Sequence, residues 1–302
     1  MRIEPGEVFG LLGPNGAGKS TLVKILMTVI RPTTAKGTLL GDALGTRHTL
    51  ARVGYLPEHH RMPEYLTGRQ VIEHFGALSG VDRVTRKRRA GELLEMTGMT
   101  TWQNTRLAGY SKGMRQRIGI AQALVNNPAF VVLDEPTDGV DPTGRRDIRG
   151  MIQQMKQQGC AVLVNSHLLS ELEVLSDRIA ILVQGKVERQ GHIHELTKAD
   201  TRIELVASCT ADKHEHLQRI AAAHGFSVVM NTTPSGLTND FTFQRPGAEE
   251  EAAQALIDSL RAERCTIRSL HARRPSLEDL FMQAVRDPST GKDVLPGAAQ
   301  RP

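Results

Sequence analysis

The chain has 302 residues, which exceeds the size of one typical domain and predicts a large domain followed by a smaller one. Hydrophobic residues make up 39% and charged residues 24%, so the chain can bury a core. The net charge of +5 is spread along the chain and only 4% of residues are aromatic, which argues against nucleic acid as a partner. The apolar runs are far shorter than the roughly 18 to 20 residues of a membrane span, and residues 1–7 do not form a secretory signal, so we expect a cytosolic protein.

The first expected element is a short strand at residues 6–12, which runs into a glycine-rich loop and then a periodic helix at 22–30. The loop reads Gly13-Pro14-Asn15-Gly16-Ala17-Gly18-Lys19-Ser20-Thr21 and contains the P-loop pattern between a strand and a helix. Its glycines let backbone N–H groups surround phosphate oxygens at the positive end of the helix. We expect Lys19 to reach the β- and γ-phosphates of a nucleotide and the Ser20 hydroxyl to bind Mg²⁺.

The middle of the chain predicts an α/β fold. Apolar residues recur at helical spacing among many charges over 69–99, which indicates a helical insertion. Apolar runs at 130–133, 161–165 and 179–183 then alternate with helical segments at 144–158 and 168–176. This alternation is typical of a buried parallel sheet.

The apolar run at 130–133 is followed by two carboxylates, Asp134 and Glu135. The carboxyl end of a parallel strand is the edge at which such sheets bind ligands. Asp134 suits a contact with Mg²⁺, and Glu135 could orient and deprotonate an attacking water. Taken alone, an Asp-Glu pair at a strand end is more often a turn or helix cap, and the presence of the P-loop is what favours catalysis.

After residue 196 the pattern changes to strand 202–207, helix 212–223, strand 226–231, strand 240–244, helix 248–262 and strand 265–270. This order matches the ferredoxin-like α+β fold, so we expect a second, small domain at 200–285 and a disordered tail at 286–302. The three cysteines, Cys160, Cys209 and Cys265, lack the spacing of a metal site and are expected to be buried thiols.

Several segments resemble motifs of the ABC ATPases. Tyr110-Ser111-Lys112-Gly113-Met114-Arg115-Gln116-Arg117 resembles the family signature, Leu-Ser-Gly-Gly-Gln, which Ser111 and Gly113 match. The segment 137–142 resembles the D-loop, and Asn165-Ser166-His167 resembles the segment with the switch histidine. The resemblance covers about residues 1–196, and 275–281 is similar to the C-terminal ending of ATPase subunits of type-2 ABC exporters.

The resemblance implies an ATP-hydrolysing, nucleotide-binding subunit that powers a separate membrane permease, with ATP and Mg²⁺ as cofactors. It implies a second ATPase subunit, a homodimer in the simplest case, in which Ser111 and Gly113 contact the nucleotide of the partner. It places the protein at the inner face of the cell membrane through its permease. His167 would hold the γ-phosphate and Glu135 would activate water. From the residues alone, Ser111 and Asp141 could be simple helix caps and His167 an ordinary surface or core histidine.

The chain departs from the family pattern at two places. The family has a Gln after the strand at 53–56, where this chain has Glu58; its carboxylate could contact Mg²⁺ or its water, or could face solvent. Only residues 1–12 precede the P-loop, so we expect the first strand of the family fold and its adenine-stacking aromatic to be missing, and Phe9 to be core. The alternative functions are a regulatory ATP-binding protein with little turnover and a soluble ABC ATPase not coupled to transport.

Overall fold

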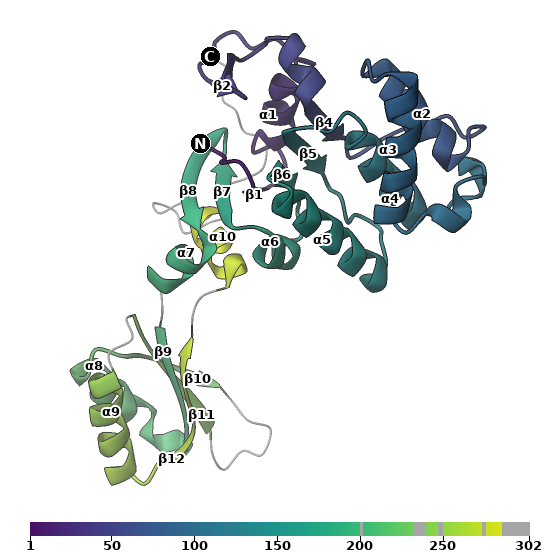
Figure 1. Ribbon diagram of the computed structural model, residues 1–302. Helices are drawn as coiled ribbons and strands as arrows, with labels where there is room; N and C mark the ends of the chain where they lie inside the picture. Colours follow the sequence, from purple (N-terminus) through teal and green to yellow (C-terminus); the bar gives the residue numbers. More distant parts are fainter. Residues whose placement is uncertain (200–201, 232–238, 247–249, 274–275, 286–302) are drawn as a thin grey trace. The chain divides into compact units, whose positions relative to one another are not determined.

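The computed structural model describes residues 1–199, 202–231, 239–246, 250–273 and 276–285 (Figure 1). The predicted tail at 286–302 lies outside these residues. The described chain divides into a larger unit, made of Met1–Ile193 with residues 281–285, and a smaller unit, His194–Leu280. The divisions fall at the start of α7 (Ile193–Ala199) and within α10 (Leu277–Val285).

The larger unit is built on a six-stranded sheet in the order β4-β5-β6-β1-β7-β8. Every neighbouring pair is parallel except β7 with β8, which pair antiparallel at one edge. The strands are β1 (Val8–Leu12), β4 (Val53–Leu56), β5 (Phe130–Asp134), β6 (Ala161–Asn165), β7 (Arg178–Val183) and β8 (Lys186–His192). The predicted parallel sheet is therefore confirmed, whereas β8 and the small hairpin of β2 (Thr38–Leu39) and β3 (Asp42–Ala43) were not predicted.

Helices cover both faces of the parallel strands, which explains why β1, β5 and β6 are buried along their whole length. On one face, α1 (Lys19–Leu26) places Val23 in a cluster with Phe9 and Val132. On the other, α5 (Pro142–Gln157) packs on β6 and α6 (Leu169–Leu175) packs on β1. Phe9 is fully buried, as predicted.

The helical insertion consists of α2 (Gly68–Leu78) and α3 (Arg83–Met96), which pack against each other and against α4 (Lys112–Ala123). Polar residues begin these helices by accepting hydrogen bonds from the first-turn N–H groups, with Thr67 capping α2, Asp82 capping α3 and Ser111 capping α4.

The helix predicted at 22–30, which is α1, ends earlier than expected. It ends at Leu26, because Thr28 adopts a left-handed backbone with φ of 56°.

The smaller unit has the element order that the sequence predicts. Its elements are β9 (Arg202–Cys209), α8 (His214–Ala223), β10 (Ser227–Asn231), β11 (Asn239–Pro246), α9 (Glu250–Ala262) and β12 (Thr266–Arg273). The sheet order is β10-β11-β9-β12, with every pair antiparallel. Leu205, Phe241 and Phe243 form its core with Leu217 of α8 and Leu256 of α9.

The cysteines of both units are free and buried, as predicted: Cys160 in the larger unit, and Cys209 and Cys265 in the smaller.

None of the described helices combines the length and the apolar character that a membrane span requires.

Candidate active site

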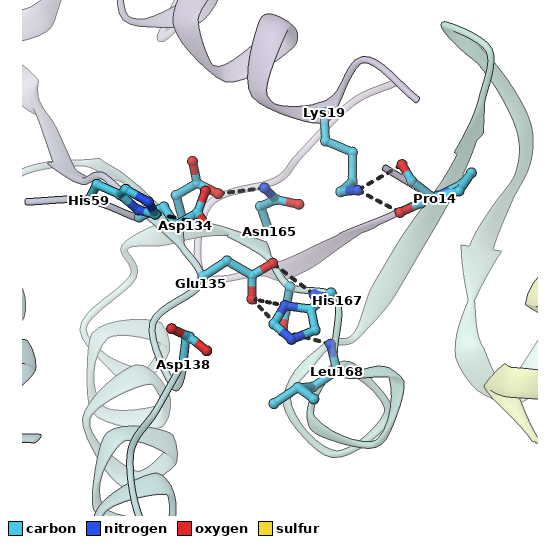
Figure 2. A network of polar contacts seen from close by, with 12 residues as sticks. Pro14, Lys19, His59, Asp134, Glu135, Asp138, Asn165, His167 and Leu168 are labelled. Carbon is cyan, nitrogen blue, oxygen red and sulfur yellow. Dashed lines mark hydrogen bonds and ion pairs between the residues drawn. The ribbon is translucent and has the colours of Figure 1, made fainter. Parts of the chain in front are cut away.

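Four parallel strands bring the predicted site residues to one edge of the large sheet. The register pairs Leu11 and Asp134 with Asn165, and Leu56 with Leu133. The carboxyl ends of β1, β4, β5 and β6 therefore lie side by side. Asp134 is the last residue of β5, and the loops that follow the four strands carry the P-loop, Glu58, Glu135 and His167. Figure 2 shows the close approach of Lys19, Asp134, Glu135, Asn165 and His167.

The P-loop leaves β1 and enters α1 through a turn that only glycine fits. A Cβ on Gly13 would lie 2.4 Å from the Leu182 carbonyl oxygen, inside any real contact distance. Gly18 has φ of 102°, a backbone conformation that L side chains rarely adopt. Asn15, Gly16, Ser20 and Thr21 are exposed, whereas Ala17 is buried. The loop therefore presents backbone N–H groups at the start of α1, the arrangement that binds phosphate.

Lys19 folds back over this loop. Its Nζ donates hydrogen bonds to the carbonyl oxygens of Gly13 at 2.5 Å and Pro14 at 3.2 Å. Burial lowers the pKa of Lys19, and the negative charges of Glu135, Asp134 and Glu58 act in the opposite direction. The ammonium group is thus held by loop carbonyls and lies within electrostatic reach of three carboxylates.

Asp134 ends β5 and accepts a short hydrogen bond from Nδ2 of Asn165 at the end of β6. Burial raises the pKa of Asp134, and the nearby Glu58 carboxylate raises it further. The Oδ1 atom of Asn165 is buried without a hydrogen-bond partner. A buried carboxylate beside an unpaired amide oxygen is the oxygen-rich environment that Mg²⁺ prefers, so the residues present fit this ion. Sequence reasoning placed Asn165 in the switch-histidine segment and assigned it no role beside Asp134, because that partner lies on another strand.

Glu135 has a left-handed backbone, with φ of 51°. Its carboxylate accepts hydrogen bonds from the His167 backbone N–H at 2.9 Å and from Ser166 Oγ at 3.3 Å, and it lies 2.8 Å from Nδ1 of His167. Burial raises the pKa of Glu135, against the opposing effect of His167. The structure therefore joins the two residues predicted to be catalytic into one pair, in which Glu135 is 10% exposed and His167 is 56% exposed at the side chain.

Glu58 lies in the loop after β4 and is exposed. Its carboxylate approaches the His59 ring at 3.6 Å, and its charge affects the pKa of Lys19, Tyr55 and Asp134. It therefore belongs to the same group of charges as the P-loop lysine.

The signature residues lie at the start of α4. The Ser111 hydroxyl accepts a hydrogen bond from Met114 N–H at 3.2 Å, so the cap predicted for Ser111 is present. Gly113 lies beside Val140 of the loop before α5, and Lys112 forms a 2.7 Å ion pair with Asp138 of that loop. Asp141 caps α5 by accepting from Gly144 N–H at 2.7 Å. The signature turn and the predicted D-loop are thus in contact with each other.

Comparisons with known proteins agree with this geometry. The model of the ABC transporter domain matches residues 1–138. An uncharacterized ABC transporter ATP-binding protein of Synechocystis sp. is 39% identical over 95% of this chain and 77% of its own length. The doxorubicin resistance ATP-binding protein DrrA of Mycobacterium tuberculosis is 35% identical over 100% of this chain and 91% of its own length.

Solved structures show the same fold. The ATP-binding cassette MJ0796, in a dimeric post-hydrolysis state bound to ADP and Pi, has a TM-score of 0.57 and 26% identity over 64% of this chain and 88% of its own. The ATP-binding subunit of another ABC transporter has a TM-score of 0.59 and 27% identity over 65% of this chain and 82% of its own. With its P-loop, its strand-end carboxylates and its near full-length relatives, the chain belongs to the family of ABC transporter ATP-binding proteins.

Proposed function

We propose that this protein is the ATP-hydrolysing, nucleotide-binding subunit of an ABC exporter and powers a separate membrane permease. The observation that carries the proposal is the convergence of the P-loop lysine, Asp134 and the Glu135–His167 pair at one sheet edge. Relatives named for doxorubicin and daunorubicin resistance support export as the coupled process.

The P-loop would hold the phosphates of ATP. Residues Gly13 to Thr21 supply backbone N–H groups and the positive end of α1, and Lys19 would exchange its bonds to Gly13 and Pro14 for bonds to phosphate oxygens. Mg²⁺ would be held by Ser20, Asp134 and Glu58, and Asn165, which donates to Asp134, would orient that carboxylate. When bound, the ion neutralises charge that develops on the phosphates.

Glu135 would act as the general base. Burial raises its pKa, which improves its ability to take a proton from water, while the bonds from Ser166 and His167 hold the carboxylate in one orientation. His167 is the more exposed member of the pair, so we assign it the contact with the γ-phosphate. Glu135 would accept the proton as the water oxygen bonds to the γ-phosphorus and the bond from that phosphorus to the terminal oxygen of ADP breaks, which yields ADP and phosphate.

A second copy of the chain would complete the site. Ser111 and Gly113 lie at the exposed start of α4, where the helix terminus and the Ser111 hydroxyl can face the ATP of a partner protomer. The dimeric state of the MJ0796 cassette supports this arrangement. The permease would hold the pair at the inner face of the cell membrane.

We also propose that residues 1–196 form the ATPase domain and that 200–285 form a ferredoxin-like domain. The antiparallel order β10-β11-β9-β12, with α8 and α9 packed on the sheet, supports the second assignment.

Phosphate release from Mg-ATP tests the function directly. The wild-type chain should hydrolyse ATP, and Glu135→Gln should retain ATP binding while turnover falls by roughly 10² to 10⁴, the range for loss of a general base. A Glu135→Gln protein with normal turnover would remove Glu135 from this role. A membrane permease that co-purifies with the chain would support coupling to transport, and a wild-type chain that hydrolyses ATP but binds no membrane protein would favour an uncoupled ABC ATPase.

A further inference from the structure

Gln116 links the signature helix to the backbone of Glu135. It lies on α4, its side chain is buried with 4% exposure, and its Nε2 donates a hydrogen bond to the Glu135 carbonyl oxygen at 3.3 Å. A buried amide that lost this acceptor would be left unsatisfied, so the contact constrains both partners. No role for Gln116 followed from the sequence pattern.

The Glu135 backbone needs such constraints. A left-handed conformation is uncommon for a residue with a long side chain and persists only where surrounding contacts determine it. The N–H of Glu135 donates to the Asn165 carbonyl at 2.8 Å, and its carbonyl accepts from Asp138 N–H at 3.2 Å as well as from Gln116. Gln116 therefore contributes the contact that comes from α4.

The same helix begins at the signature residues. Ser111 caps α4, and Gln116 follows five positions later, about 7.5 Å along the helix axis. The ion pair between Lys112 and Asp138 ties the start of α4 to the loop that follows Glu135. A displacement of Ser111 would therefore reach the Glu135 backbone through a rigid helical turn.

We infer that Gln116 is a positioning residue that makes the orientation of Glu135 depend on the placement of α4. The inference rests on the proposed function, in which Ser111 serves the nucleotide of the partner and Glu135 serves the nucleotide of its own protomer. Contact of Ser111 with ATP at one site of the dimer then orients Glu135, the general base, at the other site.

The test is a double-mutant cycle on the full chain with Mg-ATP as substrate. Gln116→Met keeps the length of the side chain but removes its donor, so kcat should fall about tenfold, the effect of one lost hydrogen bond, while ATP affinity stays within about twofold. Gln122→Met is the matched control. Gln122 lies on the same helix and donates from its side chain to a backbone carbonyl, that of Tyr55 at 2.9 Å, and its replacement should change kcat less than about twofold.

The cycle combines Ser111→Ala with each of these variants. Effects that act through one path are not additive, so Ser111→Ala should lower kcat by a smaller factor in the Gln116→Met protein than in the wild type, and by an unchanged factor in the Gln122→Met protein. Equal factors in all three backgrounds would overturn the inference while leaving the proposed function intact. A wild-type chain that releases no phosphate would refute the proposed function, and this inference with it.

Discussion

Replacing Gly13 by alanine tests the geometry of the P-loop. The new Cβ would lie 2.4 Å from the Leu182 carbonyl oxygen and 3.0 Å from the Ala17 Cβ, whereas ordinary contacts begin near 3.4 Å. Because Leu182 belongs to β7, which is paired on both sides by β1 and β8, the loop has to move, by about 1.0 Å. Overpacking of this kind costs about 1–3 kcal/mol of folding stability.

The same shift is large enough to break hydrogen bonds to phosphate. Each charge-assisted bond contributes about 1.5–3 kcal/mol, so ATP affinity should fall roughly 10- to 150-fold for every bond lost. Isothermal titration with ATP and urea unfolding measure the two effects. Gly150→Ala is the control: it lies exposed on α5 with nothing within 4 Å of the new Cβ, and it should raise stability by about 0.5–1 kcal/mol. A Gly13→Ala protein that matched the wild type in ATP affinity and in stability would refute the loop geometry.

Three further substitutions or reactions probe single groups. Lys19→Ala should weaken ATP binding about 10- to 100-fold, since a charged donor to phosphate is lost; unchanged affinity in titration would count against the P-loop assignment. Because burial raises the pKa of Asp134, the folded state disfavours its charged form at neutral pH. Without nucleotide and Mg²⁺, Asp134→Asn should therefore unfold at a higher temperature than the wild type, and a lower melting temperature would contradict this explanation. Burial raises the pKa of Cys160 to about 11 and of Cys265 to about 12, so alkylation by iodoacetamide should be slow in native protein at pH 7.5 and fast in urea. The rate for Cys160 should increase about tenfold per pH unit. Rapid labelling of the native protein would be inconsistent with buried thiols.

The elements that carry local patterns could be predicted from the sequence. Residues adjacent in the chain define the P-loop, the apolar strands β5 and β6 and the two carboxylates at the end of β5. The resemblance to ABC ATPases added Ser111 and His167 to the predicted site. β8 was missed because its side chains are mostly exposed and it lacks the apolar run of a buried strand.

The remaining features depend on residues far apart in sequence. Asn165 meets Asp134, and Gln116 meets Glu135, only because β5, β6 and α4 pack together. The left-handed backbone of Glu135 likewise follows from contacts on both sides of the residue and has no local signal.

The most direct test of the account is the association state of Glu135→Gln measured by light scattering with and without Mg-ATP. If ATP is held between the P-loop of one protomer and Ser111 of the other, this variant binds without cleaving, so it should be a monomer alone and a dimer at saturating ATP. Adding Ser111→Arg should abolish the dimer, since a bulky side chain would fill the phosphate contact. A Glu135→Gln protein that stays monomeric at saturating Mg-ATP would contradict the two-protomer site.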